Sequence, residues 1–165
     1  MAKPTKHAPA ICVGTGIVMA AGAVAGLVTK EPLWAVAGLL PITIYEAYRT
    51  EGETTRWASW VLLVALILEA LLLVLDVNLD LAQLLGRESE VVAGYTVPLG
   101  PVTLVGPVVM AVTAIILIVR TRGRYTRWLA AGIVIGSGVL IYILDPSIIG
   151  QWLGVVLDAG LPELQ

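Results

Sequence analysis

Glu69 is the side chain in this sequence best placed to do chemistry, because it lies inside an apolar stretch from Trp57 to Leu75. Asp76 follows two helical turns later on the same face of a continuous helix, and Asp80 follows one turn beyond it. A charge at the centre of a bilayer costs about 2.5–3.5 kcal/mol on insertion scales, so an acid within a span usually faces protein or water. The three carboxyl groups are therefore a candidate ion or proton site, in which Asp76 and Asp80 would draw a cation towards Glu69.

A purely structural interpretation of Glu69 competes with this site, and the sequence favours it. The predicted spans contain no Lys, Arg or His that could neutralise the acid. We therefore expect a neutral carboxyl group, hydrogen-bonded to a nearby Ser, Thr or backbone carbonyl, unless a cation or another subunit supplies positive charge. In this interpretation Asp76 merely ends the helix.

The sequence from Asp76 to Asp80, D-V-N-L-D, imitates the opening of a calcium-binding loop. Such a loop needs Gly at its sixth position and a bidentate Glu at its twelfth. Leu81 and Arg87 occupy these positions here. The sequence therefore argues against a calcium site of this kind.

Other metal, cofactor and enzyme chemistry has few candidate residues. Cys12 is the only cysteine and His7 the only histidine, which excludes an intrachain disulfide, a Cys/His zinc or iron–sulfur cluster and bis-His haem ligation. A Ser-His-Asp arrangement would have to use His7, in the polar N-terminal tail. A net charge of −2 also argues against nucleic-acid binding. We expect no metal, no cofactor and no enzymatic activity.

The composition is that of an integral membrane protein. Hydrophobic residues make up 58% and charged residues 13% of the 165 positions, whereas soluble domains carry roughly 25% charged residues. A spanning helix needs about 20 mostly apolar residues. The sequence predicts a single all-α membrane domain, residues 1–165, with about five transmembrane helices at residues 8–28, 33–48, 57–75, 98–119 and 128–144.

The remaining segments are too short to form a soluble domain. Residues 76–86 read as a continuation of the third helix, ending near Gly86. Apolar residues recur at helical spacing from Ile148 to Leu157, which predicts a C-terminal amphipathic helix lying in the membrane interface. Pro41 and Pro107 should kink their helices, because each removes a backbone hydrogen bond.

The basic residues predict the orientation of the spans, since cytoplasmic loops are rich in Lys and Arg. With the turn around Gly123 in the cytoplasm, the alternation of spans puts eight of the ten basic residues on that side. The N-terminus is then cytoplasmic and the C-terminus extracytoplasmic, in the plasma membrane of a cell. The residues on the cytoplasmic side are Lys3, Lys6, Arg49, Arg56, Arg120, Arg122, Arg124 and Arg127.

The first span also resembles a secretory signal, because it has a basic start, an apolar stretch and an Ala23-Val24-Ala25 sequence. Its apolar run is longer than the core of a usual signal. We therefore expect a retained helix.

An internal repeat links the two central turns. The nine residues from Arg49 to Trp57 recur 71 residues later, from Arg120 to Trp128, with six identities in the pattern RTxGxxTRW. Each copy ends one span and opens the next. We interpret this as a duplicated helical hairpin, residues 32–76 and 101–145, in which both copies have the same orientation, unlike the inverted repeats of many transporters.

The arginines of these turns have a structural interpretation and a functional one. Arg side chains snorkel at helix ends, Gly permits the reversal and Thr caps the next helix, which explains the motif without any ligand. Alternatively, the six arginines contact anionic lipid or an acidic partner. These candidates are Arg49, Arg56, Arg120, Arg122, Arg124 and Arg127.

Two pairs of glycines have the spacing of close helix packing, Gly22 with Gly26 and Gly132 with Gly136. We expect them to pack against helices of the same chain rather than against another subunit.

The expected function is that of a non-enzymatic membrane scaffold or accessory subunit, packed against other membrane chains or in a homo-oligomer. The alternative is a small proton or cation transporter or channel that uses Glu69. Beyond the lipid bilayer, the sequence names no partner.

Overall fold

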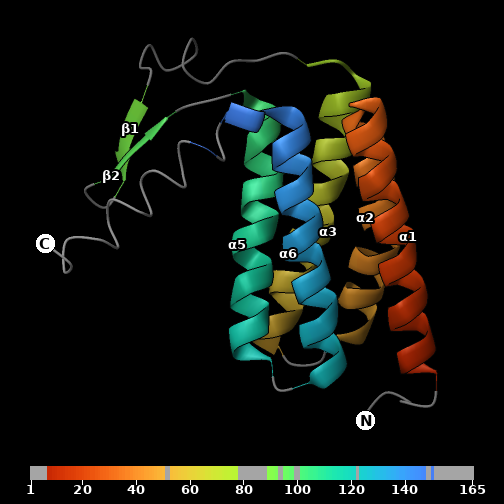
Figure 1. The fold of residues 1–165 in the computed structure, drawn as a ribbon. Coiled ribbons are helices and arrows are strands. Elements are labelled where there is room, and N and C mark those ends of the chain that lie inside the picture. The colour runs from red at the N-terminus through yellow and green to blue at the C-terminus, as the bar shows by residue number, and fades with distance from the viewer. Residues whose placement is uncertain are drawn as a thin grey trace, which may run out of the picture.

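The structure is a computed structural model, which describes residues 7–50, 53–77, 89–92, 95–98, 101–121, 123–147 and 150. Within these residues, five α-helices lie side by side and alternate in direction, and a small hairpin of two antiparallel strands lies away from them (Figure 1). The elements are α1 (Ala8–Thr29), α2 (Pro32–Arg49), α3 (Glu53–Val74), β1 (Ser89–Val92), β2 (Tyr95–Pro98), the 3-10 turn η1 (Val102–Leu104), α5 (Val105–Arg120) and α6 (Arg124–Leu144).

Four of the described helical segments are long and apolar enough to cross a membrane, which supports the prediction of an α-helical membrane protein. They are residues 8–29 (α1), 55–74 (within α3), 102–120 (η1 with α5) and 124–144 (α6). The remaining helix, α2, has 18 residues and is not among the four. At 1.5 Å per residue it is about 27 Å long.

The helices form a ring of four with a fifth on its outside. Contacts join α2 to α3, α3 to α5, α5 to α6 and α6 back to α2, while α1 packs on α2 and α6. The turns after Arg49 and Arg120 lie at the same end of this bundle as the start of α1, and we call this the arginine end. Leucine, isoleucine and alanine side chains from the four ring helices fill the core, together with Val36 and Met110.

The end of α3 differs from the prediction. We expected this helix to continue to about Gly86, but it ends at Val74. The N–H of Val77 donates to the Leu72 carbonyl at 3.0 Å, and Asp76 has a φ of 50°. A left-handed residue with such a return bond terminates a helix, and Asp tolerates this conformation better than most residues.

The second hairpin also begins differently. We expected a span from residue 98, but β2 occupies Tyr95–Pro98 and α5 begins at Val105. Pro107 therefore lies in the first turn of α5, where a missing N–H disturbs a helix least, so the reason for the expected kink does not hold within α5. Pro41 does lie inside α2. The two strands were not predicted.

Part of the prediction falls outside the described residues. Asp80 and Arg122 lie there, as does the predicted interfacial helix from Ile148 to Leu157 apart from residue 150.

Candidate functional site

Glu69 is fully buried in the described structure, and neither of its carboxylate oxygens has a hydrogen-bond partner there. It projects from α3 towards α5 at Gly106. A Cβ atom at Gly106 would collide with Glu69 Oε2, so only glycine leaves room for the carboxyl group in its present position. Leaving a buried polar group unpaired costs about 1–3 kcal/mol. A carboxyl group in this state can still form hydrogen bonds with another group.

A groove of about 410 Å³ lies between α3 and α5, and Glu69 is part of its wall. Apart from Glu69, the groove is lined by apolar side chains, two tryptophans and one glycine. We call it the α3/α5 groove. Its lining residues are Trp57, Trp60, Val61, Val64, Ala65, Leu68, Glu69 and Leu72 of α3, with Val102 of η1 and Val105, Gly106 and Val109 of α5.

Of the predicted acidic site, the structure describes Glu69 and Asp76, and it does not bring these two together. Asp76 lies exposed beyond the end of α3 rather than on its face with Glu69, and Asp80 is outside the described residues. No group of three or more His, Cys, Asp or Glu side chains suited to a metal occurs among the described residues. We expected Glu69 to form a hydrogen bond with a neighbouring hydroxyl or carbonyl group. No such bond occurs among the described residues, because the nearby helices present apolar surfaces to Glu69.

Glu46 is a second buried carboxyl group, which is not among the candidate residues predicted from the sequence. It lies in the last turn of α2, and Thr50 Oγ1 donates a 2.8 Å hydrogen bond to Glu46 Oε1. The Thr50 backbone N–H also donates to the Glu46 carbonyl at 2.9 Å. Glu46 Oε2 has no partner within the described structure. The four-residue spacing of Glu46 and Thr50 was a signal in the sequence that could have pointed to this hydrogen bond.

The described arginines of the two turns all lie at the arginine end, but their contacts differ. Arg49 Cζ lies 5.1 Å from the centre of the Tyr125 ring, a cation–π contact between α2 and α6. Arg127 Nε donates a 2.7 Å hydrogen bond to the Thr121 carbonyl across the second turn. These contacts fit the structural interpretation of the motif. Arg56, Arg120 and Arg124 are exposed.

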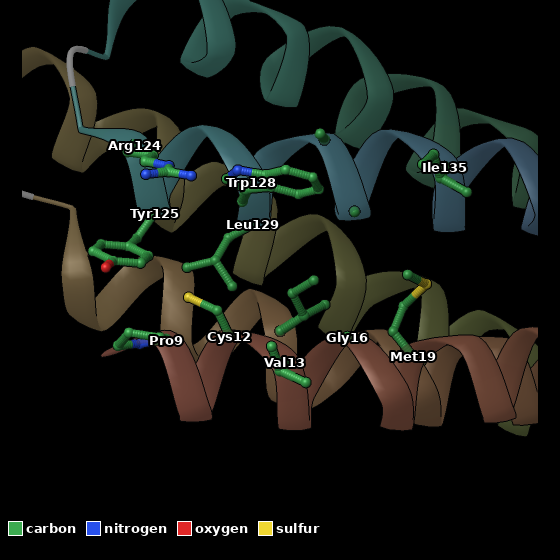
Figure 2. Close-up of a pocket in the computed structure, with 13 residues that line it drawn as sticks. Pro9, Cys12, Val13, Gly16, Met19, Arg124, Tyr125, Trp128, Leu129 and Ile135 are labelled. Atoms are coloured by element: carbon green, nitrogen blue, oxygen red, sulfur yellow. The ribbon is translucent and has the colours of Figure 1, made fainter. Parts of the chain in front are cut away.

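A second groove opens between α1 and α6 towards the arginine end (Figure 2). Its volume is about 580 Å³, and Ile42 of α2 contributes to its wall. Figure 2 shows Cys12 and Met19 of α1 facing α6, with Arg124 and Tyr125 at one end of the groove. We call it the α1/α6 groove. Further lining residues are Pro9, Val13, Gly16, Trp128, Leu129, Ala131, Gly132 and Ile135.

The predicted packing glycines lie at helix contacts within the chain. A Cβ at Gly22 would come within 2.6 Å of the Trp34 carbonyl oxygen and 2.7 Å of Gly38 Cα, so α1 and α2 touch backbone to backbone. A Cβ at Gly26 would lie 3.3 Å from the backbone nitrogen of Ala35.

Gly132 and Gly136 of α6 receive side chains from α2. A Cβ at Gly132 would lie 2.7 Å from Ile42 Cδ1, and one at Gly136 would lie 2.5 Å from Leu39 Cδ2. The Met19 sulfur of α1 would be 3.3 Å from a Cβ at Gly136. These small residues let α1, α2 and α6 approach one another closely.

Comparison with protein-family models, with curated proteins and with solved structures found no match. The fold and its apolar helices define the class of this chain as an α-helical membrane protein.

Proposed function

We propose that this chain is a non-enzymatic subunit of a membrane assembly, in which it packs against other membrane-embedded chains. The observation that carries the proposal is Glu69, a buried carboxyl group without a hydrogen-bond partner in the described structure, in the wall of an apolar groove. In hydrocarbon such a group is costly, and helices associate in membranes partly by pairing such side chains. A neighbouring chain in the groove would supply the missing partner.

We further propose that α2 is a fifth span and that the arginine end faces the cytoplasm of a plasma membrane. Support comes from the packing of α2, which lies beside α1, α3 and α6 along the bundle. The cytoplasmic location of the arginine end follows from its basic residues.

A duplicated hairpin is the third part of the proposal, and burial supports it. We define the counterpart of a residue as the residue 71 positions away in the other hairpin. Every buried residue of α5 has a buried counterpart in α2, and every buried residue of α3 has one in α6. The pairs are Val36 with Pro107, Leu39 with Met110, Thr43 with Ala114, Glu46 with Leu117, Ser59 with Ala130, Leu62 with Ile133, Ala65 with Gly136, Leu66 with Ser137 and Glu69 with Leu140.

Proton or cation transport past Glu69 is the second candidate. Two buried carboxyl groups, Glu46 and Glu69, lie at different depths of the bundle, as a relay would require. Against it, both counterparts are leucines, so the acids occupy one hairpin alone. Proton flux in reconstituted liposomes, compared with the Glu69→Gln variant, tests this candidate: flux that is absent or unchanged removes it.

Gentle purification tests the subunit proposal. The full-length chain, extracted from its native membrane in a mild detergent, should run as a complex of defined mass with another chain or with copies of itself. Light scattering and native mass spectrometry measure that mass. A monodisperse monomer without a stoichiometric second chain would overturn the proposal.

A further inference from the structure

The face that binds α1 has a counterpart on the opposite side of the ring. Gly22 and Gly26 of α1 pack against backbone atoms of Glu31, Trp34, Ala35 and Gly38 around α2. On α6, the side chain of Ile143 meets Gly26, and Gly132 and Gly136 meet Met19. We call these seven residues of α2, its N-cap and α6 the α1-binding face.

The counterparts of the α1-binding face, 71 positions away in the sequence, lie in the α3/α5 groove. All seven counterparts line that groove, although the groove is defined by its shape and not by the repeat. Since α2 with α6 and α3 with α5 are opposite edges of the ring, the two faces lie on opposite sides of the bundle. The counterparts are Val102, Val105, Gly106 and Val109 in η1 and α5, with Val61, Ala65 and Leu72 in α3.

Some residues of α2 are buried while their counterparts in α5 are not, as expected if a helix equivalent to α1 were missing from the side of α5. Ala35, Gly38 and Ile42 of α2 are buried, and each of them lies against α1 or lines the α1/α6 groove. Their counterparts in α5 are not buried; Val109, the counterpart of Gly38, is 37% exposed. A helix placed in the α3/α5 groove as α1 is placed on its face would cover them.

The two faces differ in chemistry at the position of Glu69. Its counterpart Leu140 is apolar and needs no partner, whereas Glu69 has two buried oxygens without one in the described structure. A carboxyl group accepts hydrogen bonds in either protonation state. Glu69 lines the groove, so a helix bound there should bring a donor that the carboxyl group meets by turning towards it. Beside Glu69, Gly106 replaces Ala35 and leaves room for the carboxyl group, while Val109 in place of Gly38 holds the crossing wider further along.

We propose that the α3/α5 groove binds one transmembrane helix of a different protein chain, which brings a hydrogen-bond donor to Glu69. This inference rests on the proposed subunit function and names its contact site. A second copy fits less well. Because α1 and the α3/α5 groove lie on opposite sides of the bundle, each copy would place its α1 in the groove of the next copy. Such head-to-tail contacts would form an open-ended row rather than a closed oligomer.

Photo-cross-linking in the native membrane tests the inference. Single cysteines replace Val64 and Val109 in the groove, in a full-length Cys12→Ser background that has no other cysteine. Each is labelled with benzophenone maleimide and irradiated. The matched controls are Ile67→Cys on α3 and Val112→Cys on α5, at residues that do not line the groove. Val64 and Ile67 have similar exposures of 50% and 45%.

The expected product is a single heterologous chain, cross-linked from both groove positions and from neither control. Mass spectrometry should map it to a transmembrane segment with a hydrogen-bond donor side chain. Replacing Glu69 with Leu should lower its yield about tenfold, the effect of losing one buried hydrogen bond, while Glu69→Gln should preserve most of it.

The opposing results separate this inference from the subunit proposal. Adducts of lipid mass, of a second copy or within the chain at both groove positions overturn the helix-binding groove. If the chain still co-purifies with a partner that cross-links from the control positions, the subunit function stands and the assignment of the α3/α5 groove fails. A yield unaffected by Glu69→Leu removes the role of the carboxyl group.

Discussion

At the scale of single residues, the two buried carboxyl groups, Glu46 and Glu69, differ in their hydrogen bonding. Glu46 receives a hydrogen bond from Thr50, four residues later at the end of α2. Its counterpart is Leu117, and the counterpart of Thr50 is Thr121, whose buried hydroxyl has no hydrogen-bond partner within the described structure. The two threonines have equivalent backbone positions at helix ends, so they form a natural pair for comparison.

Replacing Thr50 with Val should destabilise the protein by about 1–3 kcal/mol, because Glu46 Oε1 would lose its donor while it stays buried. Thr50→Ser should retain most of the stability. Thr121→Val, the matched control, should be neutral or slightly stabilising, since no hydrogen bond is lost. Thermal unfolding in one detergent, followed by circular dichroism, measures all three. Equal losses for Thr50→Val and Thr121→Val would contradict the role of the Glu46 hydrogen bond.

At the scale of elements, glycine decides where α1 can dock. Gly22 lies against the backbone of α2, whereas a Cβ at Gly14 would meet nothing within 4 Å outside its own helix. Both residues lie inside α1. Replacing glycine with alanine should therefore change the stability in opposite directions at the two positions.

Gly22→Ala should lower stability by about 1–3 kcal/mol, because its methyl group would overlap Trp34 and Gly38 backbone atoms and separate the helices. Gly14→Ala should raise stability by about 0.5–1 kcal/mol, because alanine is the better helix former in an open position. Unfolding in the same detergent measures both variants. A stabilising Gly22→Ala would show that α1 does not cross α2 in this way.

At the scale of the whole molecule, the arrangement of the helices makes a prediction about sidedness. The turn at Gly123 and the segment after α6 lie at opposite ends of the bundle. If the bundle spans the bilayer, these two places must face opposite compartments.

Cysteine labelling tests this orientation in a Cys12→Ser background. A membrane-impermeant maleimide, added outside intact cells, should label Ser147→Cys and leave Gly123→Cys unlabelled until the membrane is opened. Neither substitution alters a charge, so the basic residues that favour the predicted orientation are kept. Labelling of both positions from the same side would overturn the topology.

Much of the helical framework could be predicted from the sequence because it depends on properties that run along the chain. Apolar length and the absence of charge predict a membrane helix whatever its neighbours are, and four such helices are present. The spacing of Gly22 and Gly26 similarly marked a surface where another backbone can approach. The duplication remains a prediction supported by burial.

Tertiary structure alone decided which polar groups are buried and which have partners. Glu46 and Arg49 are three residues apart at a helix end, but neighbouring helices bury the first completely and the second only in part. Glu69 lacks a hydrogen-bond partner in the described structure because of what α5 places beside it, namely Gly106. The α3/α5 groove exists because side chains of α3, η1 and α5 come together on one side of the ring, and such a relation between distant segments appears only when the helices are assembled.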